Sequence, residues 1–238
     1  LGRFIQELYM LEVPFLYPET RDINTVTWTL IDDINALAND RGFEILGFGY
    51  EGPRNINSVE SFDTLEALQN YKLRIPEAPL YVGMAKALGA VPTPTAFTEA
   101  YTALQTGVAD GMESGPSTTY NNKFYEAAPY YVLTEHIVNP CYLAINLDYF
   151  NAMPEEYQQI MRDAGKKATD MMLEDVLKSN EEVLATMKDE GLTVVQLAEG
   201  EAAKFRETLE PFSEEYAASI GPEAVELLSK VREILAEQ

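Results

Sequence analysis

The sequence predicts an α/β protein built of two lobes that one long helix connects. Strand-like and helix-like segments alternate along the 238 residues. That length exceeds the usual single core of about 100 to 150 residues, so one large or two smaller domains are expected. Residues 154 to 190 have the pattern of one uninterrupted helix.

Most elements are predicted from apolar periodicity and from the Gly and Pro residues that end them. The expected helices are 25–40, 64–70, 80–89 and 98–107, and the expected strands are 43–49, 72–75 and the extended segment 90–95. Alternation at these lengths predicts α/β units with parallel pairing. Two apolar segments, 130–138 and 141–147, are separated by Asn139 and Pro140 and are predicted to be long central strands.

The long helix is the most informative element. Pro154 suits the first helical position, the acidic residues after it complement the helix dipole, and Gly191 ends the run. At 1.5 Å per residue the segment spans ~55 Å, whereas a domain of ~120 residues has a radius of gyration near 14 Å. The apolar stripe lapses at 178–182, and no heptad persists as a coiled coil would require. We therefore expect its first half to pack on one lobe and its second half on the other. The stripe comprises Tyr157, Ile160, Met161, Ala164, Ala168, Met171, Met172 and Val176, and resumes at Val183, Leu184 and Met187.

Gly47, Gly49 and Gly52 have the G-x-G-x-x-G spacing of a dinucleotide-binding turn. Such a turn requires a helix at the third glycine, whose amides hold the pyrophosphate. The residues after Gly52 show no helical period, so a nucleotide site is not expected and no cofactor is predicted. The glycines have two alternative uses, a tight turn or a segment where the backbone bends between lobes.

Composition excludes several classes of function. Lys and Arg number 17 against 39 Asp and Glu, a net charge of −22, so nucleic acid and anionic membranes would be repelled. Cys141 and His136 are each the only residue of their type, which removes an internal disulfide and a His-rich zinc site, and Cys141 is expected to be a buried, inert thiol. No apolar run reaches the ~20 residues that cross a bilayer. The sequence opens at Leu1 without an initiating Met or a signal peptide, so we expect that an upstream segment was removed or is not included.

Several segments resemble the solute-binding proteins of tripartite ATP-independent periplasmic (TRAP) transporters, of the C4-dicarboxylate-binding (DctP) type. They are "LEVPFLYPET", "KLRIPEAPLYVGMAKALGAVPTPTAFTEAYTALQTGVADGMES", "NNKFYEAAPYYVLTEHIV" and "FNAMPEEYQQIM". The resemblance covers nearly the whole chain and implies a periplasmic-binding-protein-like (Venus flytrap) fold, with the long helix across both lobes. The opening strands and helices of the first lobe in that family have no counterpart here.

Arg74 is the principal candidate for holding a ligand. A carboxylate leaving water needs donors that replace its hydration, and a guanidinium provides two parallel bonds. Arg74 lies at the end of a short strand and close to Pro76, where α/β sheets bind ligands. From the residues alone, a surface ion pair is the alternative. The resemblance favours the ligand, because the arginine of "LRIP" is the carboxylate clamp of the family.

The resemblance implies further site residues. Arg54 matches a second arginine of the family, and Phe97 an aromatic residue against the apolar part of the ligand, with a core role as the alternative. Ser114 stands where many relatives have asparagine and Met112 where they have an amide. These departures favour a partly apolar, less hydroxylated carboxylate.

Glu113, Tyr120 and Asn121 are expected in or beside the same pocket. Glu113 is the only carboxylate that could assist a metal, and a single carboxylate is poor evidence for one, so none is predicted. Asp110 and Glu113, which lie close together in the sequence, could form an acid/base pair with His136, and this is the enzymatic alternative. No nucleophile, cofactor turn or metal set accompanies it, so we predict no catalytic residues.

We therefore expect a periplasmic, monomeric solute-binding protein that captures a small organic carboxylate and delivers it to the membrane permease of a TRAP transporter. The alternatives are a carboxylate-processing extracytoplasmic enzyme and the ligand-binding domain of a sensor. Lobe I is expected to comprise 1–51 and 140–178, incomplete at its N-terminus, and lobe II 52–139 and 179–238. Closure is expected about segments 49–52 and 138–142.

Overall fold

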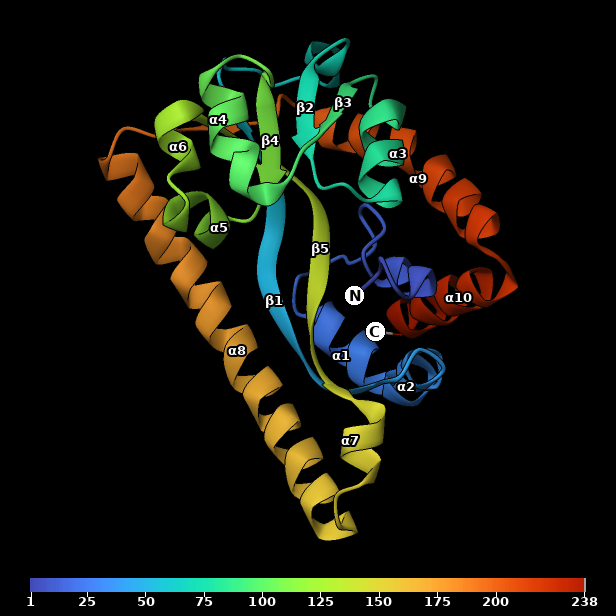
Figure 1. Ribbon diagram of the computed structural model, residues 1–238. Coiled ribbons are helices and arrows are strands. Elements are labelled where there is room, and N and C mark those ends of the chain that lie inside the picture. The colour runs from blue at the N-terminus through green and yellow to red at the C-terminus, as the bar shows by residue number, and fades with distance from the viewer. Residues whose placement is uncertain (238) are drawn as a thin grey trace.

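The computed structural model describes residues 1–237, in which one mixed sheet of six strands has the order β3-β2-β4-β1-β5-β6 (Figure 1). The strands are β1 (Phe43–Ser58), β2 (Lys72–Ile75), β3 (Val91–Pro94), β4 (Gly111–Ser114), β5 (Tyr130–Asn146) and β6 (Thr193–Gln196). The helices are η1 (Gln6–Leu11), α1 (Asp22–Thr29), α2 (Ile31–Asn39), η2 (Leu65–Leu68), α3 (Pro79–Ala87), η3 (Phe97–Glu99), α4 (Ala100–Gln105), α5 (Pro116–Asn121), α6 (Phe124–Ala127), α7 (Leu147–Asn151), α8 (Glu155–Asp189), α9 (Glu201–Ile220) and α10 (Pro222–Ala236).

Two long antiparallel strands, β1 and β5, connect the upper group of short strands with α7 below (Figure 1). The expectation that β1 ends at Gly49 is wrong, because the strand continues to Ser58. The expected division of β5 at Asn139 and Pro140 is also wrong. Pro140 pairs with Tyr50 beside a register irregularity of the ribbon, where the missing N–H of proline is tolerated.

The sheet is mixed, so the expected parallel pairing holds for only part of it. β2 is parallel to β3 and β4, and β5 is parallel to β6, as the alternating pattern predicts. β1, however, is antiparallel to both β4 and β5. The β2-α3-β3-η3-α4-β4 segment thus forms a compact parallel unit on one side of the long ribbon.

The single helix α8 runs beside β1 from α7 to the upper group of helices (Figure 1), and its ends lie within one residue of those predicted. The first half of the predicted packing stripe is wrong, because Ile160 is 54% and Met171 58% exposed and the buried positions there are Gly165, Thr169 and Leu173. The second half agrees with the prediction, since Met187 is buried and Val183 and Leu184 pack against its cluster.

Close approach to β1 explains which face of α8 is buried. A Cβ on Gly165 would collide with the backbone oxygen of Leu46, and a Cβ on Gly47 would lie 2.6 Å from the backbone oxygen of Gly165. Only small residues allow this contact. The Thr169 hydroxyl accepts a hydrogen bond from the Phe48 N–H at 2.8 Å, so polar side chains fasten the helix to the strand.

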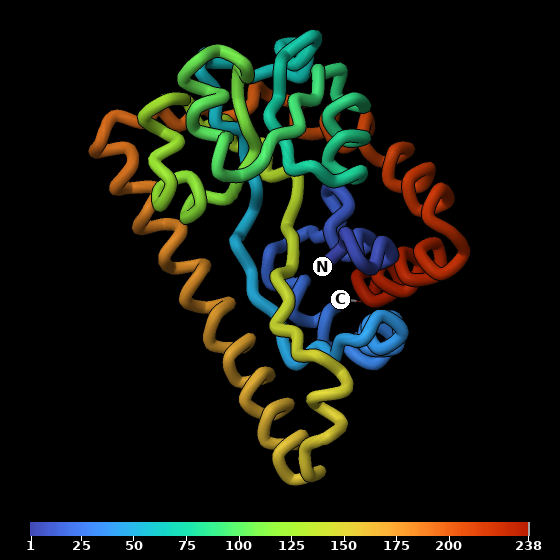
Figure 2. Tube along the Cα trace, viewed as in Figure 1, coloured from blue at the N-terminus to red at the C-terminus, as the bar shows by residue number. Residues whose placement is uncertain are grey.

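Helices α3, α9 and α10 lie on the side of the molecule opposite α8 (Figure 1). The predicted helix 25–40 is divided into α1 and α2 at Leu30, whose φ of −100° and ψ of 14° lie outside the helical region. α10 packs against η1 and α1, which brings the end of the chain beside its beginning (Figure 2). No helix among residues 1–237 is long and apolar enough to cross a membrane.

Candidate ligand-binding site

A cavity of about 450 Å³ lies where β2 and β4 end and where the loop after β3 passes. The parallel strands β2, β3 and β4 direct their carboxyl ends to this edge, where ligands bind in open α/β sheets. The lining residues come from β2 and β4, from the segments that follow β2 and β3, from β1, from α5 with the residue after it, and from the N-terminal segment. They are Arg3, Glu51, Arg54, Arg74, Pro76, Glu77, Thr95, Ala96, Phe97, Met112, Glu113, Ser114, Thr118, Asn121 and Asn122.

Arg74 is buried at this edge, with 2% of its surface exposed. Its Nε donates to the Thr95 hydroxyl at 3.2 Å and its Nη2 donates to the Thr95 carbonyl at 2.7 Å. Thr95 therefore holds one edge of the guanidinium. The Nη1 nitrogen has no hydrogen-bond partner within residues 1–237. The Nη1–Nη2 edge is thus oriented in advance for a two-bond contact with a planar anion.

Burial lowers the pKa of Arg74 below its ordinary value, while the Glu113 charge opposes this shift. The guanidinium remains charged at neutral pH, because arginine is not deprotonated in proteins. A buried cation without a carboxylate directly bound to it is an unusual arrangement. An anion in the cavity would supply the missing partner.

Arg54 also lines the cavity, but its donors are occupied. Its Nε and Nη2 form a two-pronged contact with the Glu113 carboxylate, with 2.9 Å from Nη2 to Oε1, and its Nη1 donates to Glu51 at 3.2 Å. Burial opposes the charges of both Arg54 and Glu113. Their attraction nevertheless raises the pKa of Arg54 and lowers that of Glu113. A direct contact of Arg54 with a ligand stays a prediction, since the geometry gives this arginine acidic partners within the protein.

His136 lies next to this buried ion pair. Its Nε2 lies 3.8 Å from Glu113 Oε2, and its Nδ1 lies 2.8 Å from the hydroxyl of Thr134. Sequence reasoning considered His136 with Asp110 or Glu113 as an acid/base pair. Glu113, however, is fully buried with both carboxylate oxygens bound to Arg54, and His136 is 1% exposed and is not among the residues that line the cavity, so this geometry does not favour proton transfer to a substrate.

Phe97 and Ser114 lie in the cavity wall, whereas Tyr120 does not. Phe97 is 49% exposed, packs edge-to-face on Phe124 and has the Arg74 guanidinium over its ring at 5.9 Å. The Ser114 hydroxyl accepts from the Asn57 side chain at 3.0 Å and is therefore held inside the wall. Tyr120 is absent from the lining and stacks on Tyr125 at 6.1 Å.

Sequence reasoning missed several lining residues, of which Thr95 is the most important. It lies two positions before Phe97, in the extended segment after β3, so its place at the carboxyl end of a parallel strand was the available signal. Arg3 and Glu77 were also missed. They form an exposed ion pair at 3.7 Å, and residues so far apart in sequence carry no local signal of such a contact.

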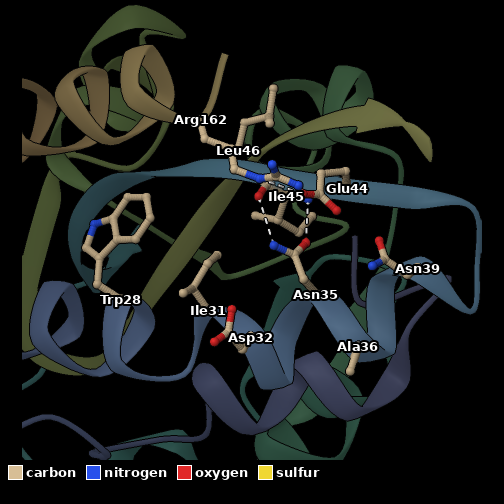
Figure 3. A pocket seen from close by; sticks show the side chains of 10 residues that line it. All are labelled: Trp28, Ile31, Asp32, Asn35, Ala36, Asn39, Glu44, Ile45, Leu46 and Arg162. Atoms are coloured by element: carbon tan, nitrogen blue, oxygen red, sulfur yellow. Dashed lines mark hydrogen bonds and ion pairs between the residues drawn. The ribbon is translucent and has the colours of Figure 1, made fainter. Parts of the chain in front are cut away.

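A second cavity of about 510 Å³ lies between α1, α2, β1 and α8 and is less suited to an anion (Figure 3). Arg162, its only basic lining residue among residues 1–237, donates to Glu44 at 2.8 Å, and Asp32 adds a further negative charge. The Asn35 side chain accepts from the Ile45 N–H at 2.7 Å and donates to the Ile45 carbonyl at 3.1 Å (Figure 3). The Asn35 amide thus occupies the backbone N–H and carbonyl of Ile45, which a neighbouring strand would otherwise pair with.

Cysteine and metal chemistry have little support in the described residues. Cys141 is partly buried, and burial raises the pKa of its thiol to about 11, which disfavours the reactive thiolate. Residues 1–237 contain no group of three His, Cys, Asp or Glu side chains arranged to hold a metal ion.

The fold and this cavity together define a solute-binding protein of the two-lobed α/β class. Residues 1–219 match the family described as DctP, bacterial extracellular solute-binding protein, family 7. The chain belongs to this family, and the resemblance seen in the sequence is confirmed. The expectations of an extracytoplasmic location and of binding rather than catalysis are confirmed at the level of the family.

Similar proteins and structures support the same conclusion. A solute-binding protein of Sulfitobacter sp. (strain NAS-14.1) is 31% identical over 237 residues, which is 98% of this chain and 70% of that protein. The sialic acid-binding periplasmic protein SiaP of Vibrio cholerae is 32% identical over 180 residues, covering 76% of this chain and 55% of that protein.

Among solved structures, a TRAP periplasmic solute-binding protein from Sulfitobacter sp. NAS-14.1 with bound α-D-taluronate has a TM-score of 0.86 at 30% identity. The match covers 97% of this chain and 74% of that protein. A Haemophilus influenzae protein with bound L-gulonate has a TM-score of 0.92 at 24% identity, covers 98% of this chain and is itself covered to 77%, which supports the fold. The expected two-lobed fold is confirmed.

Proposed function

We propose that this chain captures a small organic carboxylate in the cavity at Arg74 and delivers it to the membrane permease of a TRAP transporter. The observation that carries the proposal is the geometry of Arg74. Its guanidinium is buried, one edge is held by Thr95, and the other edge lacks a partner in the described chain beside a cavity of about 450 Å³. A charged donor preoriented in this way gains most from a planar anion.

We assign the other predicted residues supporting roles. Phe97 offers an exposed ring to the apolar part of a ligand, and Glu113 fixes Arg54 in the wall. Ser114 is held by Asn57 and supplies a polar wall of fixed shape. Tyr120 acts from behind the wall through its stack with Tyr125.

We propose closure of two lobes about segments 49–52 and 138–142, with lobe I built from 1–51 and 140–178 and lobe II from 52–139 and most of 179–238. In support, the two segments pair with each other and carry a register irregularity between Tyr50 and Pro53. Gly52 has a φ of +79°, which favours glycine. Because α10 packs on η1 and α1, we assign this last helix to lobe I. Closure traps the ligand because the closed state binds it more tightly.

A thermal-shift screen tests the function. The purified protein would be scanned with monocarboxylates, dicarboxylates, sugar acids and aromatic acids, each beside its uncharged amide. A ligand at about 100 times its Kd adds ~2.7 kcal/mol of stability, which raises the Tm of a chain of this size by roughly 5–10 °C. Calorimetry should give one site per chain, and size-exclusion chromatography with light scattering should give a monomer.

The same screen distinguishes carboxylate binding from non-specific stabilisation and from catalysis. Equal shifts by an acid and its amide would show that the anion is not recognised. No shift by any carboxylate would reject the proposal. Conversion of a bound acid to a product during incubation would indicate an enzyme instead.

A further inference from the structure

The charges that line the cavity are balanced before any ligand enters. Three arginines face three glutamates: Arg3, Arg54 and Arg74 against Glu51, Glu77 and Glu113. Arg3 and Glu77 pair with each other at the exposed rim, with side chains 59% and 55% exposed. Arg54 pairs with Glu113 and with Glu51. Within residues 1–237, Arg74 is the only lining cation without a carboxylate contact.

The group of Glu51, Arg54 and Glu113 carries one excess negative charge. Glu113 is fully buried and satisfied by Arg54, so it is ionised at neutral pH. Glu51 is the third member, its side chain is 35% exposed, and it touches only the Nη1 edge of Arg54. Arg54 therefore cannot neutralise a second anionic group unless it releases an acidic partner.

We propose that the site selects monocarboxylates with an uncharged remainder and discriminates against dicarboxylates of the same size. This inference rests on the proposed function, because it concerns the same cavity. One carboxylate completes the contacts of Arg74. A second one would face the excess charge of the Glu51 group, and like charges placed against the wrong ligand are an efficient source of specificity.

The uncharged part of the cavity fits this selection. Asn121 and Asn122 provide amides, Thr118 a hydroxyl and Phe97 an exposed ring. These groups can bind hydroxyl and apolar parts of a ligand without adding charge.

Isothermal titration calorimetry with matched pairs tests the inference. L-Gulonate and D-glucarate differ only in whether the terminal carbon is a hydroxymethyl or a carboxylate, and butyrate and succinate form a simpler pair. In whichever pair binds, we expect the monocarboxylate to bind at least about tenfold more tightly than the dicarboxylate. Repulsion between the second carboxylate and a negative charge ~8 Å away, at an effective dielectric of 20, weakens Kd by more than tenfold.

Glu51→Gln identifies the origin of the selection. This substitution keeps the side-chain shape and removes the excess charge without touching Arg74. It should tighten dicarboxylate binding about tenfold relative to monocarboxylate binding. Glu215→Gln is the matched control, because Glu215 is exposed and lies outside the cavity lining, so it changes only the net charge.

The outcomes separate this inference from the proposed function. A parent protein that binds the dicarboxylate as tightly as its partner would overturn the inference and leave carboxylate capture intact. Equal effects of Glu51→Gln on both members of a pair would also overturn it. Absence of binding by both pairs and by every carboxylate in the screen would reject the function and the inference together.

Discussion

Replacing Arg74 by alanine should abolish most of the ligand affinity. The structure leaves the Nη1–Nη2 edge for the ligand, so the substitution removes two charge-assisted hydrogen bonds and leaves a carboxylate desolvated without its counter-charge. Truncating one partner of a buried charge pair costs about 2–5 kcal/mol. At 1.4 kcal/mol per tenfold change, Kd should rise roughly 30-fold to several thousand-fold.

Arg74→Lys separates charge from geometry. Lysine keeps the positive charge but cannot form the two parallel hydrogen bonds to a carboxylate or the two contacts with Thr95. We therefore expect a ligand Kd between that of the parent and that of Arg74→Ala. Calorimetry at 25 °C with the best ligand of the screen measures both variants. Thermal unfolding verifies that each variant folds.

Arg3→Ala is the control for a general charge effect. Arg3 lines the same cavity, but its side chain is 59% exposed and its Glu77 contact of 3.7 Å lies at the rim. Exposed ion pairs contribute about 0–1 kcal/mol, so Kd should change less than about fivefold. The reasoning on Arg74 is refuted if folded Arg74→Ala binds within threefold of the parent, or if Arg3→Ala is the more damaging change.

Three further predictions concern Thr95, Glu12 and Gly165. Thr95→Val removes the hydroxyl that accepts from Arg74 but keeps the backbone carbonyl contact, so calorimetry should show roughly 3–10-fold weaker binding; unchanged affinity would contradict the positioning role. Burial raises the pKa of Glu12 from 4.5 to about 7. The stability that the protonated Glu12 carboxyl gives the folded state is therefore complete below pH 4.5 and is lost as pH rises through 7. The difference in unfolding free energy between Glu12→Gln and the parent should therefore shift by about 2–3 kcal/mol in favour of the variant from pH 5 to pH 8. Urea unfolding at the two pH values measures it, and an equal difference at both would disprove the pKa shift. Gly165→Ala places a Cβ against the Leu46 backbone oxygen and should lower stability by about 1–3 kcal/mol despite better helix propensity, whereas an unchanged Tm would show that the helix can move away from β1.

Local signals predicted those parts of the fold that local chemistry determines. Strand β2 was predicted at its observed bounds, because Pro76 stops it and its alternation is short and clear. The ends of α8 were predicted to within one residue from Pro154 and Gly191. Arg74 was placed at the carboxyl end of a strand by the same reasoning, and the structure brings it to the cavity.

The partners of Arg54 could not be predicted in this way. Glu113 is 59 positions away in sequence, and the two side chains meet because β1 pairs with β4 antiparallel, with Ile56 opposite Glu113. The expected parallel pairing would not have produced this register. Sequence reasoning therefore named both residues as ligand contacts but missed that they satisfy each other.

The packing of α8 shows why periodicity alone was insufficient and how the helix could serve closure. Thr169 accepts from the Phe48 N–H on one side of segment 49–52, and Asn180 donates to the Glu51 carbonyl within it at 3.1 Å. Asn180 Oδ1 also accepts from Ser117 of α5 at 2.8 Å, which ties the upper half of α8 to the group carrying the cavity wall. Helix α8 is thus attached to β1 before the proposed hinge through Thr169, and through Asn180 it is attached both to the hinge segment and to α5. We expect the proposed closure about 49–52 to be a rotation about the line where α8 meets β1, since stretching that line would break the contacts of α8 with the Phe48 N–H and the Glu51 carbonyl.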